Sequence, residues 1–469
     1  DRRQRQMCIR DSLRWFFSHS SGKEILEFID QQAELQQLVH DILKEARQQG
    51  ADQAEVSVSA EEGLGVSVRK GELENVEFNQ DRGFGITLQF GQRRGTASTT
   101  DSSPQAIQET VIAAKNIARF TEDDPYCGLA DAELMPQQAV DLDMYHPWEL
   151  SADDAQLLAA ECESVGLDVD PRIANSDGAQ VSTQQGIRVY GNSHGFVGSY
   201  ASTRHSLSCV LIGEDGNGMQ RDYWYTVARS ADELDSAAHV GREAGERTIA
   251  RLAPSKAPTG SFPIMLAPQL AAGLIGHLLG AISGGAQYRK ASFLLGSVGQ
   301  QVLPTWLSLQ ESPLLPRSLG GAYFDGDGVA TRSNRFVDAG ILRSYVLSSY
   351  AARKLELATT ANAGGVHNLA LLGPSVSRDE LLRELGTGLY ICELMGQGVN
   401  GVTGDYSRGA AGFWVEDGEI AHPVDEFTIA GNLRDMLTNI VRMGDDFDLR
   451  SNVRAPSLLL APMTVAGES

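Results

Sequence analysis

The sequence predicts an α+β protein with mostly antiparallel sheets and flanking helices. In some stretches apolar residues recur at helical spacing, and in others they alternate with polar residues, as in half-buried strands. The two kinds of stretch come in separate blocks, whereas a doubly wound parallel sheet would need them to alternate regularly. Glycines punctuate the alternating blocks, which is typical of antiparallel strands joined by tight turns.

An N-terminal α+β domain is expected over residues 31–126. Apolar residues at helical spacing predict a helix over 31–49, which a glycine ends. A second helix is expected over Pro104–Phe120, with Ser103 as its N-terminal cap and a proline at its first position. Between the helices, over 54–90, alternating apolar residues predict short strands with turns at Gly63, Gly71, Gly83 and Gly91.

A central α+β segment is expected over residues 127–252. The pattern predicts a helix over 152–167, strands over 172–229 and a further helix over 237–252. Residues 129–147 before them have no regular pattern and are predicted to form a loop.

A glycine-rich and β-rich C-terminal domain is expected over residues 253–469. It opens with a linker over 253–261, which holds two prolines and a glycine. Helices are predicted near 269–282 and 378–385. Residues 1–24 remain unassigned, because their arginine-rich start resembles none of these patterns; we interpret them as a tail or an artefact.

The composition describes an ordinary globular protein of 469 residues with a strongly acidic surface. Apolar residues make up 42% and charged residues 21%, and the net charge is −22 with a sequence pI near 4.8. Such a charge opposes binding to nucleic acid or to an anionic membrane, since phosphate groups are bound by clustered Lys and Arg. We therefore expect neither partner.

Cysteine spacing and hydropathy indicate a cytoplasmic protein. The five cysteines are widely spaced and form no Cys-x-x-Cys pair, so neither a zinc ribbon nor a thioredoxin-like redox pair is predicted. Unpaired thiols fit a reducing compartment. No apolar run approaches the about 20 residues that a membrane-spanning helix needs.

The segment from Thr403 to Ile420 is the most informative about function. Four glycines and two alanines lie among polar residues, and Asp417–Gly418 predicts a hairpin turn. Small residues let another backbone approach closely, and the following strand offers main-chain hydrogen bonds. Together with Gly386–Gly398 just upstream, this segment resembles the TldD/PmbA family of two-subunit cytosolic metallopeptidases, and most closely its PmbA (TldE) branch.

Other parts of the chain carry the same resemblance, which extends from about Glu34 to Gly467. No single block is specific, but their order and coverage together are. The further blocks are Glu74–Asn79, Gly191–Gly195, Ser202–Ser206 and Ala430–Leu433.

The resemblance implies a zinc site in the catalytic branch, made by a His-Glu-x-x-x-His helix and a cysteine near the C-terminus. In the matching helix of this chain His277 takes the first ligand position, but Leu278 and Ile282 replace the glutamate and the second histidine. No cysteine follows Cys392. One imidazole cannot hold a catalytic zinc ion, so we expect no metal and no catalytic residue in this chain, with zinc bound by a TldD-type partner.

His277 also has a plainer interpretation. A single histidine on an apolar helix is more often packed and hydrogen-bonded than catalytic. The small residues around it, over 271–281, predict close helix packing, and a partner subunit is one candidate for what packs there.

The glycine-rich segment supplies the predicted peptide-binding residues. Arg408 could meet a peptide carboxylate or pair with Asp405 to lock the loop, and the glycines could equally serve only turns and bulges. The predicted residues are Gly404, Asp405, Tyr406, Ser407, Arg408 and Gly409.

The resemblance implies a non-catalytic subunit that forms a heterodimer with a TldD-type zinc subunit, which cleaves unfolded peptides. One rival is a homodimeric peptide-binding protein without an enzymatic role. Another is a metal-independent hydrolase that uses His194 or His205, although these residues lie in a strand-and-turn context and not at the strand-to-helix elbow that typically holds a nucleophilic serine. A calcium loop at Asp325–Val329 is disfavoured, because Phe336 stands where the twelfth-position glutamate belongs; a tight hairpin is expected there.

Overall fold

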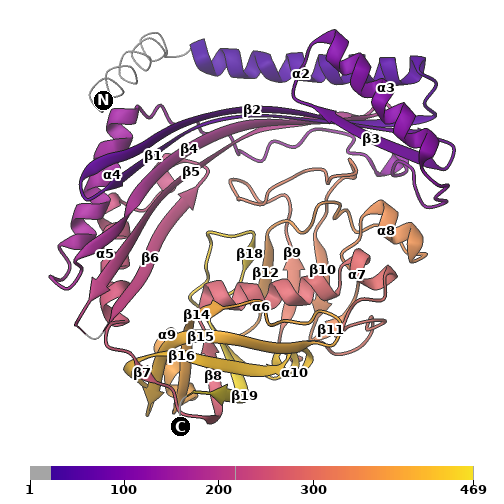
Figure 1. Cartoon of the computed structure of the whole chain (residues 1–469). Coiled ribbons are helices and arrows are strands. Elements are labelled where there is room, and N and C mark those ends of the chain that lie inside the picture. Colours follow the sequence, from indigo (N-terminus) through magenta and orange to yellow (C-terminus); the bar gives the residue numbers. More distant parts are fainter. Residues whose placement is uncertain (1–22, 217, 468–469) are drawn as a thin grey trace.

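A computed structural model describes residues 23–216 and 218–467. A long arched sheet carries helices on its outer side, and a C-terminal body with two further sheets lies on its inner side (Figure 1). Helices and strands are mixed and most strand pairs are antiparallel, so the predicted α+β class is confirmed. Most of the predicted tail lies outside the described residues.

The arched sheet has six strands in the order β3-β2-β1-β4-β5-β6, and every neighbouring pair is antiparallel. Because β1 lies between β2 and β4, residues 31–126 and 127–252 build this sheet together. The strands are β1 Gln53–Arg69, β2 Glu72–Phe90, β3 Arg93–Thr99, β4 Asn175–Asn192, β5 Val197–Glu214 and β6 Met219–Ala228.

β1 and β2 are single long strands, which corrects two of the predicted turns. The chain does turn at Gly71 and Gly91, with φ angles of 72° and 62°. Gly63 and Gly83 lie inside the strands, so the turns predicted there are wrong. A Cβ on Gly63 would lie 2.8 Å from the carbonyl oxygen of Thr183, so glycine here lets β4 approach closely.

Four helices cover the outer face of the arched sheet (Figure 1). One buried apolar cluster joins the first two helices to β1 and β2, and another joins the next two to β1, β4 and β5. Ser103 caps the second helix as predicted, accepting a hydrogen bond from the backbone N–H of Ala106 at 3.3 Å. The helices are α2 Lys23–Gln48, α3 Pro104–Phe120, α4 Ala152–Leu167 and α5 Ala237–Ala250, and the predicted bounds of α3 and α4 are confirmed.

The larger sheet of the body has eight strands in the order β13-β17-β19-β8-β14-β15-β16-β7. Its last strand in sequence, β19, lies between β17 and β8. Part of the predicted linker forms β7, which pairs in parallel with β16. The strands are β7 Ser255–Lys256, β8 Gly260–Leu266, β13 Ser375–Val376, β14 Gly388–Met395, β15 Asp405–Glu416, β16 Glu419–Asn432, β17 Ile440–Gly444 and β19 Leu458–Ala466.

The second sheet of the body has five strands in the order β11-β10-β9-β12-β18. The largest apolar core of the described chain lies between the two sheets and includes Leu266, Phe336 and Phe427. The strands are β9 Ser308–Glu311, β10 Asn334–Asp338, β11 Ile341–Leu342, β12 Leu369–Leu372 and β18 Val453–Arg454.

Helices of the body are mostly short, and the longest of them, α6, packs one side into this core through Leu274, Ile275 and Leu278. None of the helices in residues 23–216 and 218–467 is long and apolar enough to cross a bilayer. The helices are α6 Pro268–Ala281, α7 Gly284–Tyr288, α8 Ser349–Lys354, α9 Arg378–Leu385 and α10 Leu433–Thr438, and the predicted bounds of α9 are confirmed.

The arch is fastened to the body near one end by α8. The phenol of Tyr350 donates a hydrogen bond to Asp124 Oδ2 at 2.7 Å, and Arg353 Nη1 donates to the carbonyl oxygen of Tyr126 at 3.1 Å. The ammonium group of Lys354 lies 5.2 Å from the ring centre of Tyr126, within the range of a cation–π contact. These contacts form the α8 clamp.

A second fastening joins the body to β6, at the other end of the arch (Figure 1). The guanidinium group of Arg450 lies 4.0 Å from the ring centre of Trp224. Its Nη1 donates to the carbonyl oxygen of Tyr225 at 3.0 Å, while Asp448 holds its Nε at 2.9 Å. The body is therefore tied to the arch near both ends, and further contacts lie between them, such as the hydrogen bond from the backbone N–H of Ser199 to the hydroxyl of Tyr323.

Candidate functional site

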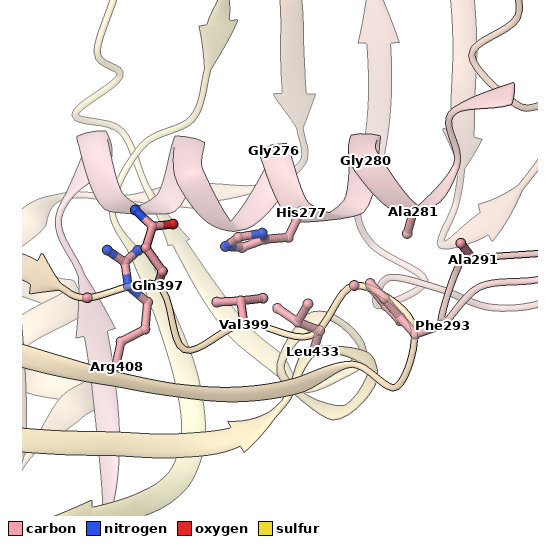
Figure 2. Close-up of a pocket in the computed structure, with 12 residues that line it drawn as sticks. Gly276, His277, Gly280, Ala281, Ala291, Phe293, Gln397, Val399, Arg408 and Leu433 are labelled. Carbon is pink, nitrogen blue, oxygen red and sulfur yellow. The ribbon is translucent and has the colours of Figure 1, made fainter. Parts of the chain in front are cut away.

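A pocket of about 380 Å³ lies between α6, β15 and the loop that joins β14 to β15 (Figure 2). The α6 side of the pocket is open because it carries glycines. A Cβ on Gly276 or Gly280 would meet none of the described atoms within 4 Å. The lining residues are Gly276, His277, Gly280, Ala281, Ala291, Phe293, Gly396, Gln397, Val399, Gly401, Arg408 and Leu433.

The pocket brings together two residues that the sequence singled out separately, His277 and Arg408. His277 projects from α6 and Arg408 from β15, and both side chains are partly buried. Tyr406 packs against His277, with ring centres 6.1 Å apart in an edge-to-face contact. Of the six predicted peptide-binding residues, only Arg408 lines the pocket.

The main chain around Arg408 is paired within the chain itself. On one side β15 pairs with β16 from Asp405 onward. On the other side the backbone N–H of Ser407 donates to the carbonyl oxygen of Gly398 at 2.7 Å, and the N–H of Asn400 donates to that of Asp405 at 2.9 Å. A peptide therefore finds no open strand edge along this stretch, and the approaching backbone that its small residues accommodate is the chain's own.

The remaining predicted residues of this segment lie outside the pocket. Asp405 and Ser407 are exposed, and Gly404 is buried beside Asn432. Of the two alternatives for Arg408, an ion pair with Asp405 is not formed among the described residues, and Arg408 Nη2 donates to the carbonyl oxygen of Leu394 at 3.2 Å. Asp405 instead accepts a hydrogen bond from the hydroxyl of Thr403 at 2.6 Å.

Positive charge dominates the electrostatics of the pocket. None of its lining residues is acidic. Burial lowers the pKa of His277, and the nearby charge of Arg408 lowers it further, so the imidazole is neutral at pH 7. Arg408 Nε is buried and has no hydrogen-bond partner among the described residues. The pocket therefore presents one fixed cation and one neutral imidazole.

The donor set beside His277 does not fit a His-Glu-type zinc site. Leu278 and Ile282, at the positions of the missing glutamate and second histidine, are fully buried in the apolar core. In the parts of the chain that the structure describes, no group of three or more His, Cys, Asp or Glu side chains could hold a metal ion. The pocket supplies a single imidazole and no carboxylate.

The two histidines of the hydrolase hypothesis are engaged in structural hydrogen bonds. His205 is buried, with Nδ1 2.9 Å from the hydroxyl of Thr183 and Nε2 2.9 Å from the carbonyl oxygen of His146. His194 Nε2 lies 3.1 Å from the carbonyl oxygen of Ala130. Among the residues that the structure describes, neither imidazole contacts a serine hydroxyl through a ring nitrogen, so the arrangement forms no Ser-His pair there.

The Asp325–Val329 segment forms the tight hairpin that was expected. The backbone N–H of Asp325 donates to the carbonyl oxygen of Val329 at 2.9 Å. The Asp325 carboxylate accepts hydrogen bonds from the backbone N–H groups of Asp327, Val329 and Ala363, each at 2.9 Å. Burial raises the pKa of Asp325 to about 6. The oxygens of this carboxylate already accept three main-chain hydrogen bonds, so the carboxylate is unsuited to binding a cation.

The lining residues outside α6 and β15 were not predicted from the sequence. Gln397 belongs to the glycine-rich stretch that carried the resemblance, and that position was the only signal for it. Phe293, Val399 and Leu433 have no sequence signal, since each is an apolar residue among many. Also unforeseen is a groove of about 1040 Å³ between the inner face of the arched sheet and body loops around Gly320.

Similarity to known protein families extends over most of the chain. Three domain profiles of one family match consecutive parts of the chain. They are "PmbA/TldA metallopeptidase domain 1" over residues 54–118, the "central domain" over 145–252 and the "C-terminal domain" over 259–467. The chain belongs to the PmbA/TldD metallopeptidase family. The predicted family resemblance is thereby confirmed.

Individual proteins resemble the chain over nearly its whole length. It is 50% identical over 418 residues to the metalloprotease PmbA of Escherichia coli O157:H7, which covers 89% of this chain and 93% of that protein. A Bacteroides thetaiotaomicron protein described as a candidate modulator of DNA gyrase shares 26% identity, with a TM-score of 0.88 over 93% of this chain and 99% of its own. TldE from Thermococcus kodakarensis, 20% identical with a TM-score of 0.81 over 92% and 100% of the two chains, shares the fold.

Proposed function

We propose that this chain is the non-catalytic subunit of a cytosolic two-subunit metallopeptidase. It would pair with a TldD-type subunit whose zinc ion hydrolyses unfolded peptides, and it would contribute structure and peptide contacts. The likeness to PmbA-type metalloproteases and to the TldE fold supports this assignment. The free thiols of Cys162 and Cys209, both buried in the arched part of the molecule, suit a reducing cytosol.

The observation that carries the proposal is the orientation of α6. His277 lines the pocket, where the first zinc ligand of a catalytic relative would stand. Leu278 and Ile282 are fully buried, so the other two positions of the motif serve packing. A zinc peptidase needs further ligands and a carboxylate that activates water, and this helix supplies neither.

The experiment is reconstitution with a TldD-type subunit. The purified chain should contain no stoichiometric zinc and should cleave no peptide alone, while the mixture should copurify and cleave. His277→Ala should leave the zinc content of the mixture unchanged, because the proposed zinc ion is bound by the partner. About one zinc per chain, lost together with activity in His277→Ala, would overturn the proposal. Preparing the chain in cells that lack the partner excludes contamination.

The rival function, a homodimeric peptide-binding protein, is distinguished by the same preparation. Light scattering at micromolar concentration, with and without the TldD-type subunit, measures the mass of the assembly. The proposal expects a heteromeric particle once the partner is added. A stable homodimer that does not associate with the TldD-type subunit and still binds peptide would favour the rival function.

A further inference from the structure

We infer that the pocket beside α6 binds the C-terminal end of a peptide whose last side chain is apolar. The inference rests on the proposed role in peptide handling and adds which part of the peptide is recognised. The terminal carboxylate would meet Arg408, and the terminal side chain would enter the apolar part of the pocket.

One end of the pocket is polar and cationic. Arg408 and Gln397 lie together there, and the imidazole of His277 points toward the same space (Figure 2). Arg408 forms no ion pair within residues 23–216 and 218–467, although the whole chain carries a net charge of −22. A partly buried arginine without a carboxylate is a binding group for an anion.

The other end of the pocket is apolar. Phe293, Ala281 and Ala291 lie at this end, and Val399 and Leu433 lie between it and the polar end (Figure 2). The volume of about 380 Å³ is near the lower limit of typical ligand pockets, about 300–1,000 Å³. Such a space admits the end of an extended chain with one side chain and excludes folded protein.

A chain end fits this pocket better than the middle of a peptide. A peptide backbone carries a formal negative charge only at its C-terminus, where the carboxylate lies next to the last side chain. Recognition of a mid-chain segment by strand addition would need an open edge, but the main chain at Ser407 already pairs with Gly398. An aspartate or glutamate side chain also carries a carboxylate. The test must therefore distinguish binding of a C-terminal carboxylate from binding of an acidic side chain.

The test measures binding of fluorescent peptides to the isolated chain by anisotropy. The probe is an unstructured peptide that ends in leucine, compared with the same peptide carrying a C-terminal amide. We expect the free acid to bind at least about tenfold more tightly, which corresponds to about 1.4 kcal/mol. Arg408→Gln should weaken binding of the acid to the level of the amide. Arg119→Gln, which removes an exposed arginine on α3, should change neither.

A matched pair of variants tests the location. Gly280→Leu places a side chain in the pocket, whereas Gly273→Leu places one on the same helix at a position that does not line it. At both positions a Cβ would meet no described atom within 4 Å, so both variants should fold. Gly280→Leu should reduce binding of the acid at least about tenfold, and Gly273→Leu should not.

Equal affinity for acid and amide, or an unchanged affinity in Arg408→Gln, would overturn the inference. An amidated peptide with an internal aspartate that binds as tightly as the free acid would show a site for any carboxylate, and would also overturn it. These outcomes differ from failure of the proposed function. If the chain assembles with the zinc subunit but binds the acid and the amide equally, only the inference is contradicted. If the chain prefers the acid but does not assemble with the zinc subunit, only the proposed function is contradicted.

Discussion

At the scale of single residues, Arg408 sets the electrostatic conditions for its neighbours. Its charge lowers the pKa of His277, adding to the larger effect of burial. It also opposes the effect of burial on Tyr406, whose pKa is raised overall. One fixed cation therefore favours a neutral imidazole in a pocket that lacks carboxylates.

Removal of this charge should be visible in the titration of His277. In Arg408→Gln the pKa of His277 should rise toward the ordinary value, because an imidazolium no longer faces a cation. NMR titration of the imidazole in both proteins measures the change, and His277→Ala assigns the signal. An identical titration in both proteins would show that burial alone depresses the pKa.

The lowered pKa of His277 also determines whether the protein gains or loses stability as the pH falls. The folded-state pKa of His277 lies below its unfolded value of about 6.5, so near that pH the unfolded chain binds more protons. This residue therefore lowers the free energy of unfolding as pH falls through that range, and the loss should be smaller in Arg408→Gln.

The sequence pointed to His277 and Arg408 for unrelated reasons, one through a degenerate motif and the other through a glycine-rich context. It could not show that they share a pocket. Their proximity depends on how α6 is rotated over the sheet and on how the loop before β15 folds back. Both are set by packing of the whole body rather than by spacing along the chain.

At the scale of elements, β15 shows why small residues recur in the glycine-rich segment. A Cβ on Gly412 would lie 2.1 Å from the carbonyl oxygen of Tyr390 on β14. A Cβ on Gly409 would lie 3.4 Å from Cβ of Met395, an ordinary contact. The two glycines share one strand but differ in how closely the neighbouring backbone approaches.

This difference predicts unequal costs for the same substitution. Gly412→Ala should lower the free energy of unfolding by at least about 1–3 kcal/mol, because a backbone atom must move. Gly409→Ala should change it by less than about 1 kcal/mol. Chemical denaturation of both variants measures the difference. Equal costs would mean that close backbone approach does not explain the glycine at 412.

Element prediction succeeded where a local signal decides the conformation. Asp417 and Gly418 adopt φ angles of 52° and 82°, as the dipeptide predicted for the hairpin between β15 and β16. It failed at Gly63 and Gly83, where glycine serves contact between strands. A single sequence cannot distinguish a glycine that forms a turn from a glycine that permits close contact between strands. The distinction depends on which strand lies beside the glycine in the fold.

At the scale of the whole molecule, the arch and the body are two layers that contact each other at several places, among them the α8 clamp, Arg450 and the hydrogen bond from Tyr190 to the carbonyl oxygen of Asp327. The sequence indicated that 253–261 separates two structural units. It did not indicate that residues 31–126 and 127–252 share a sheet, because the pairing of β1 with β4 joins strands far apart in the chain. Such pairing leaves no local trace in the pattern of either strand.

The α8 clamp should be separable from the fold itself. Arg353→Ala removes donors to main-chain carbonyl oxygens in the loop that follows α3, including that of Tyr126. We expect faster hydrogen exchange in that loop, with little change in β6 near Arg450. Arg335→Ala, which changes a half-exposed arginine on β10, is the control. Exchange that rises equally throughout the arch would show that the clamp instead supports the whole fold.

The position of β19 has a consequence for synthesis of the protein. Although β19 is the last strand of the described chain, β17 and β8 flank it within the sheet. Because β8 is synthesised long before β19, the edge of β8 that pairs with β19 remains unpaired until residues 458–466 have been synthesised. The six strands of the arch all precede residue 229 and can pair much earlier. The order of translation therefore separates folding into two stages, with the arch first and the larger sheet of the body completed only after β19 has been synthesised.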